Sequence, residues 1–86
     1  MKRETIEIGA RTVVRSRYRG FQVDVITGYD TARDRYPVHI EVTGAGPDSR
    51  SIKLLRVATE FTIYDAIDAG FAAAERAIDA AEFNNI

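Results

Sequence analysis

Alternating apolar and polar residues predict β-strands over the first two-thirds of the chain. In the second of these segments Phe21, Val23 and Val25 point one way while Gln22 and Asp24 point the other. Side chains that favour the extended state, mainly valine, isoleucine, threonine and tyrosine, fill most of the segments. The predicted strands cover residues 12–18, 21–28, 36–43 and 51–57.

Glycine and proline mark the breaks between these strands. Arg19-Gly20 predicts a tight hairpin turn, because glycine adopts a positive φ without steric cost. Polar, turn-forming residues at 28–35 and 44–50 predict two further loops. Pro37 lacks a backbone donor and should lie at a strand start or on a sheet edge. Segment 5–8 is either a short edge strand or a loose tail.

The last third of the chain changes to a helical period. Thr62 and Asp65 form a start like a capping box, with Phe61 placed to pack on the first turn. An apolar stripe follows at steps of three and four residues. The stripe comprises Ile63, Ile67, Phe71, Ala74, Ile78 and Ala81. A helix of about 20 residues would be about 30 Å long, so it should cross the sheet obliquely or extend beyond it.

Strands joined by hairpins and followed by one helix indicate an α+β domain in two layers. The expected fold is an antiparallel sheet of three to four strands packed by one long C-terminal amphipathic helix, in the order β-β-β-β-α. The length of 86 residues fits a single domain over 1–86, with residues 1–10 as the tail or edge strand. Hydrophobic residues make up 45% and charged residues 29%, which excludes a disordered chain.

Charge is unevenly distributed along a chain whose net charge is −1. Residues 1–60 are mildly basic, and the helical residues 61–86 are acidic. The arginines of the first predicted strand fall on odd positions, so an extended chain would direct them to one face. A positive face with nearby aromatics is typical of nucleic-acid modules, although a solvated strand face explains it too. The residues concerned are Arg11, Arg15, Arg17 and Arg19.

Small residues widen the apolar stripe of the helix. They allow another backbone to approach closely, and Gly70 costs roughly 1 kcal/mol relative to alanine inside a helix. Close packing on the chain's own sheet is one explanation. A helix flank that meets a second copy of the chain is the other, with Ala66, Gly70, Ala73 and Ala77 as the contact residues.

Little in the sequence points to catalysis or to a cofactor. The chain has no cysteine and one histidine, His39, for which Asp24 on a neighbouring strand is the available orienting acid. Asp30 and Asp34 lie too sparsely in their loop for a calcium site. The Gly44-Ala45-Gly46-Pro47 segment precedes a strand and not a helix, unlike a dinucleotide loop. We therefore assign no catalytic, metal or cofactor-binding residue.

Four short motifs resemble a group of small uncharacterised proteobacterial domains built of a β-sheet and a helix. The resemblance spans about residues 13–80 and implies that fold, with no assigned activity. Tyr36-Pro37-Val38-x-Ile40-Glu41 is similar to the strand opening of HicB-type antitoxin domains, but the extra N-terminal hairpin departs from them. The four motifs are Tyr18-Arg19-Gly20-Phe21, Phe61-Thr62-x-x-Asp65-Ala66, Gly70-Phe71 and Ala77-Ile78-Asp79.

These observations favour a small interaction domain over an enzyme. We expect a non-enzymatic, cytoplasmic protein that binds an unknown protein partner or forms a homodimer. The alternative is a weak nucleic-acid-binding module that uses the arginine-rich strand. No membrane partner is expected, because no apolar run approaches the roughly 20 residues of a membrane helix.

Overall fold

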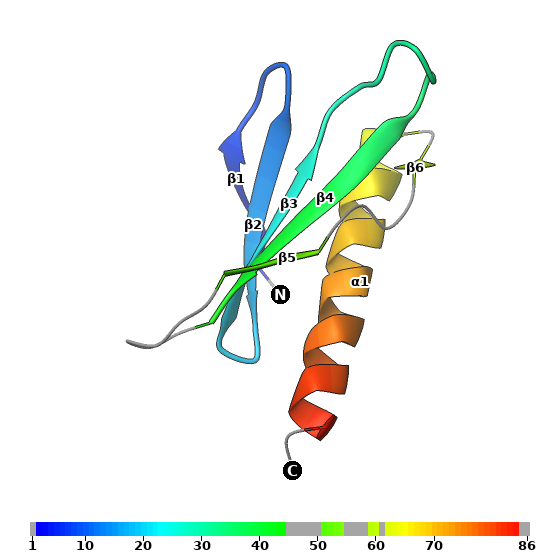
Figure 1. The fold of residues 1–86 in the computed structure, drawn as a ribbon. Coiled ribbons are helices and arrows are strands. Elements are labelled where there is room, and N and C mark those ends of the chain that lie inside the picture. Colours follow the sequence, from blue (N-terminus) through cyan, green and yellow to red (C-terminus); the bar gives the residue numbers. More distant parts are fainter. Residues whose placement is uncertain (1, 45–50, 55–58, 61, 85–86) are drawn as a thin grey trace.

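The computed structural model describes residues 2–44, 51–54, 59–60 and 62–84, with side chains for 2–44 and 62–80. One antiparallel sheet carries a single long helix on one of its faces (Figure 1). The predicted α+β class and the order of strands before one C-terminal helix are confirmed. The elements are β1 (Glu4–Glu7), β2 (Thr12–Tyr18), β3 (Phe21–Thr27), β4 (Tyr36–Thr43), β5 (Ser51–Leu54), β6 (Thr59–Glu60) and α1 (Ile63–Asn84).

The sheet has the order β1-β2-β3-β4-β5, and β6 pairs with the start of β4. Three predicted strands match β2, β3 and β4 within a residue, and β5 begins where the fourth was predicted. Residues 55–57 of that prediction and most of the loop predicted at 44–50 lie outside the described residues. The N-terminal segment is an edge strand that pairs with β2 through a bulge. The two-residue strand β6 was not predicted, because so short a segment carries no periodicity.

The β2–β3 hairpin closes with the predicted two-residue turn. Arg19 has φ 51° and Gly20 has φ 84°. Two successive positive φ values are typical of a type I′ turn, whose twist matches that of the strands it joins. Tyr18 and Phe21 pair directly beside the turn, so the register of the hairpin follows from the loop length.

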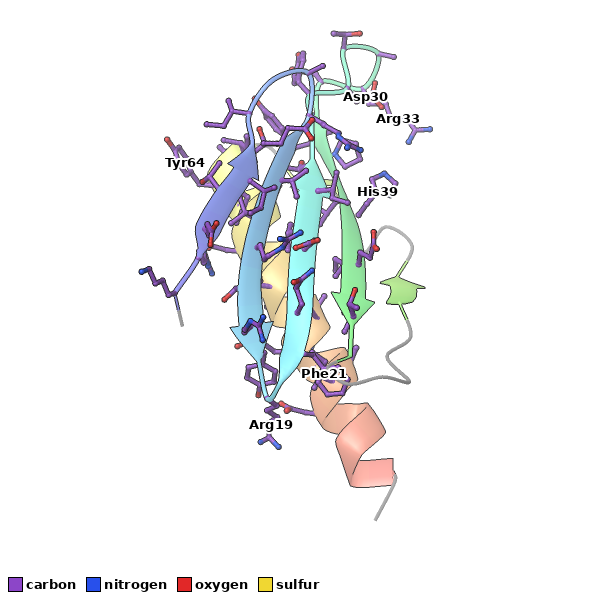
Figure 2. The ribbon with its side chains drawn as sticks, turned by 90° about the vertical axis from the view of Figure 1, so that its left-hand side faces the viewer. Arg19, Phe21, Asp30, Arg33, His39 and Tyr64 are labelled. Atoms are coloured by element: carbon purple, nitrogen blue, oxygen red, sulfur yellow. The ribbon has the colours of Figure 1, made fainter. Side chains whose placement is uncertain are left out.

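Helix α1 begins as its capping residues predict. The Asp65 N–H donates to Thr62 Oγ1 at 3.1 Å, which satisfies one of the free donors of the first turn. Phe61 lies outside the described residues. The helix crosses behind the sheet obliquely and continues past the β2–β3 turn (Figure 2), as its length of 22 residues requires.

The core lies between α1 and one face of β2, β3 and β4. Phe71 is its largest fully buried side chain, with 1% of its surface exposed, and it packs against strand valines that are equally buried. Alternation along the strands places every second residue in this layer. The buried cluster comprises Val14, Val23, Val25, Val38, Ile40, Val42, Ala66, Phe71, Ala73, Ala74 and Ile78.

The N-terminal segment closes the side of the core next to β2. The Arg3 guanidinium lies 4.7 Å from the centroid of the Phe71 ring and pairs with Asp68 at 2.6 Å. The buried Ser16 hydroxyl donates to the Lys2 carbonyl at 2.9 Å. Residues before the first predicted strand therefore join the sheet to the helix.

No helix in the described part of the chain combines the length and the apolarity needed to span a membrane.

Candidate interaction surface

The two faces of the sheet differ in what covers them. Helix α1 covers one face, which we call the covered face. Among the described residues no element lies over the other face, which we call the open face and which is turned toward the viewer in Figure 2. The register of the three central strands sets its side chains. The open face comprises Glu4, Val13, Arg15, Arg17, Gln22, Asp24, Ile26, Pro37, His39, Glu41 and Thr43.

A row of charged residues crosses the open face. The register pairs Glu4 with Arg15, Arg15 with Asp24, and Asp24 with Glu41. Lys53 occupies the next register position, on β5. Signs along this row are mixed, so the face has no single strong charge.

A two-bond fork joins Arg15 to Asp24 at the centre of this row. Arg15 Nε donates to Asp24 Oδ1 at 2.8 Å, and Arg15 Nη2 donates to Oδ2 at 3.2 Å. The hydrogen bonds and the negative charge of Asp24 raise the pKa of Arg15 above its ordinary value. The fork fixes both side chains in one orientation on the strand surface.

The four arginines of the predicted nucleic-acid contact do not share one face. Arg15 is engaged by Asp24, and Arg11 lies before β2 and pairs with Glu7 at 3.0 Å, which raises the pKa of Arg11. Arg19 lies in the hairpin turn and reaches the helix, where its Nε is 3.0 Å from Asp79 Oδ1. The prediction of a single arginine face is therefore wrong for Arg19, which lies beyond the end of β2, whereas Arg11 lies beside Ile26 and His39 of the open face.

Arg17 differs from the other three arginines. It is exposed on the open face, and no hydrogen bond or ion pair in the described part of the chain involves it. Gln22 is its register neighbour on β3. A single cation without a partner would bind a phosphate backbone only weakly, because the affinity of a protein for nucleic acid grows with the number of phosphates that it neutralises.

An open hollow of about 450 Å³ lies at the end of the open face near the loops. Ile26 and Pro37 supply its apolar surface, and Arg11, Asp30 and His39 supply polar groups. One wall is formed where the β1–β2 connection approaches β3. There a Cβ atom on Gly28 would lie 2.8 Å from the Ala10 carbonyl oxygen, so glycine is required for this approach.

Tyr29 forms an aromatic rim beside the hollow. Its ring lies 5.5 Å from the Tyr36 ring at an angle of 56°, and its hydroxyl donates to Asp34. The pKa of Tyr29 is raised above its ordinary value of 10.0, mainly by that hydrogen bond and to a smaller extent by partial burial. Tyr29 is therefore neutral at physiological pH, with 49% of its surface exposed.

His39 and Asp24, the acid–base pair considered from the sequence, are not directly opposite each other. His39 faces Ile26 across the β3–β4 pair, and Asp24 faces Glu41. Both oxygens of Asp24 accept from Arg15. His39 is exposed at the edge of the hollow, where it can donate to or accept from a bound group. Among the described residues, no three acidic or histidine side chains gather as a metal site would require.

The small-residue flank considered for self-association lies mainly in the core. Ala66 is 0% and Ala73 is 9% exposed, and Ala77 is half-buried. A Cβ atom on Gly70 would lie 2.6 Å from Val25 Cγ1 and 3.0 Å from Val38 Cγ1. The small residues thus let α1 approach its own sheet. This is the explanation by close packing within the chain that the sequence left open beside self-association.

Ile26, Pro37 and the N-terminal Arg3 were not predicted as surface or contact residues. Ile26 and Pro37 alternate with the core residues Val25 and Val38. This alternation could have placed them on the face of the sheet opposite the core. No comparable signal marked Arg3, because its contacts with Asp68 and Phe71 join positions 65 or more residues apart.

Comparison of the chain with protein-family models, with curated proteins and with solved structures finds no significant match. The resemblance to small proteobacterial sheet-and-helix domains therefore stays a prediction.

Proposed function

We propose that the chain is a non-enzymatic interaction domain that binds a protein partner through its open face. The observation that carries this proposal is the uneven coverage of the sheet: α1 packs on one face only. On the opposite face, apolar Ile26 and Pro37 lie among the ionic and polar groups of the open face beside the hollow.

The chemistry of the open face suits a protein partner. Non-obligate interfaces combine apolar and polar groups in about the proportion of an ordinary surface, with arginine and tyrosine enriched. Arg15 is already oriented by Asp24, so less side-chain freedom is lost when a partner contacts it. His39, Arg11 and Tyr29 can add directional hydrogen bonds at the hollow.

The arrangement favours a protein over a nucleic acid. Three of the four arginines have a carboxylate partner within 3.0 Å, so in the described part of the chain only Arg17 of these four offers a phosphate a cation without a neighbouring carboxylate partner. We expect no binding in titrations with single-stranded or duplex DNA and RNA at low salt. Affinity that falls steeply with salt, and that Arg17→Ala abolishes, would instead support the nucleic-acid alternative.

Site-specific photocrosslinking in the native cells tests the proposed surface. A photoreactive amino acid replaces His39 on the open face, and in a matched control replaces Tyr64, which is 78% exposed on α1. We expect covalent adducts with protein from position 39 and none from position 64. No adduct at 39, or equal yields at both positions, would refute the proposal.

A further inference from the structure

We propose that the partner of the open face is a second copy of this chain, docked face to face about a two-fold axis that runs along β3. This inference rests on the proposed function. Strand β3 is the middle strand of the order β1-β2-β3-β4-β5. A two-fold rotation about it therefore places β2 of one copy over β4 of the other, and β1 over β5.

The charges on the open face are complementary to themselves under this rotation. Arg15 on β2 and Glu41 on β4 lie in one row, each beside Asp24. The rotation brings Arg15 of each copy opposite Glu41 of the other, which gives two symmetric contacts between opposite charges.

Other two-fold axes bring like charges together. An axis along β2 places Arg15 against its own copy and Glu4 against Asp24. An axis along the charged row places every charged residue against itself. With the axis along β3, Asp24 is the only residue of the charged row that meets its own copy, and the fork from Arg15 already compensates that carboxylate. Since like charges in contact weaken an interface, the β3 axis is favoured.

The apolar residues of the open face lie near the same axis. Ile26 is on β3 and meets its own copy in the docked pair. Val13 and His39 flank Ile26 in the register, on β2 and β4, so the rotation places Val13 opposite His39. Because Val13 is only 8% exposed, Ile26 and its copy supply the apolar contact on the axis, with the ion pairs next to it.

The size of the face predicts a weak dimer. The three central strands are seven or eight residues long and the two outer strands four, so at a spacing of about 4.8 Å the face covers roughly 480 Å². Stable complexes bury about 800 Å² on each partner, and smaller interfaces are typical of transient association. The second copy should therefore dissociate on dilution.

Crosslinking through an introduced cysteine tests this geometry, because the chain contains no cysteine. Ile26→Cys lies on the proposed axis, and Tyr64→Cys on α1 is the matched control. A short bismaleimide should join two copies through position 26, with a yield that rises with concentration, and should leave the control monomeric. Equal yields at both positions, or none at position 26, would overturn the second-copy proposal.

Exchanging the charges of Arg15 and Glu41 distinguishes a role of Arg15 in dimerisation from a purely structural role. Arg15→Glu and Glu41→Arg should each weaken dimerisation at least tenfold, measured by analytical ultracentrifugation. The double variant should restore it, since the docked pairs are rebuilt and Asp24 regains a cation across the β3–β4 pair. Circular dichroism confirms that each variant is folded. Failure of the rescue would overturn the proposed axis.

The photocrosslinking experiment separates this inference from the proposed function. An adduct at position 39 with twice the mass of the chain supports the second copy. An adduct with a different protein, together with no bismaleimide product at Ile26→Cys, would overturn the second copy and leave the proposed function in place. Absence of any adduct would refute both.

Discussion

The covered and open faces of the sheet are built from alternate residues of the same strands, yet they differ sharply in chemistry. On the covered face Val23, Val25 and Val38 are at most 1% exposed. On the open face their neighbours Gln22, Asp24 and Ile26 are half-buried, and Asp24 forms an ion pair with Arg15. The described part of the chain has one helix, α1, and it covers one face of the sheet (Figure 2). The comparison assigns stability to the covered face, and we propose that the open face binds a partner.

The largest expected effect is on the covered face, at Phe71. Replacement by alanine removes the largest fully buried side chain and the ring beneath Arg3. We expect Phe71→Ala to lower the free energy of unfolding by about 3–5 kcal/mol, measured by urea denaturation. Tyr64→Ala, at an exposed position of the same helix, should change it by less than about 0.5 kcal/mol. Similar losses for both variants would contradict the assignment of the core.

Gly70→Ala should show how closely the helix approaches the sheet. The new methyl group would lie 2.6 Å from Val25 Cγ1, and such overpacking costs about 1–3 kcal/mol. Alanine favours the helix by about 1 kcal/mol, so we expect a net loss of up to about 2 kcal/mol in thermal or urea unfolding. Gly9→Ala, where nothing lies within 4 Å, is the control. A more stable Gly70→Ala variant would show that the layers are less tightly packed.

Ile26→Lys should separate binding from stability. Its side chain is half-buried on the open face, so we expect a loss of stability of about 1 kcal/mol or less. Dimerisation should weaken at least tenfold, because the substitution brings two lysines together at the axis. Sedimentation velocity beside urea unfolding measures both quantities. Tyr64→Lys should alter neither. A large loss of stability without a change in association would reverse the assignment of the faces.

The smallest effect concerns Tyr29 at the rim of the hollow. Its folded-state pKa is raised by the hydrogen bond to Asp34, so its contribution to stability is fully present below the ordinary value of 10.0 and is lost as pH rises through the folded-state pKa. The stability difference between the wild type and Tyr29→Phe should be constant from pH 7 to about pH 9 and should shrink above pH 10. A difference independent of pH would show that the hydrogen bond to Asp34 does not form.

Strand periodicity was enough to predict the fold, because each central strand carries its own pattern. Val38, Ile40 and Val42 alternate with polar residues and face the helix as expected. The helix cap at Thr62 and the turn at Arg19-Gly20 were also predicted from a few neighbouring residues, and both are present in the structure.

The candidate surface was harder to predict, because its contacts join distant segments. The odd spacing of the arginines suggested one face, but Arg19 turns toward Asp79 on the helix and Arg11 toward Glu7. The small residues of α1 face their own sheet, because Gly70 lies directly over Val25 and Val38. Which side of an amphipathic helix meets which partner depends on the tertiary arrangement, which helical periodicity alone does not specify.

The central claim, that the chain associates through its open face, is tested most directly by methyl NMR of isoleucine-labelled protein across a dilution series. Ile26 is on the open face, while Ile40 and Ile78 are in the core and at most 4% exposed. We predict that the Ile26 methyl signal shifts with concentration while the signals of Ile40 and Ile78 stay in place. An Ile26 signal that does not move while the protein self-associates, or shifts confined to helix residues, would contradict the claim.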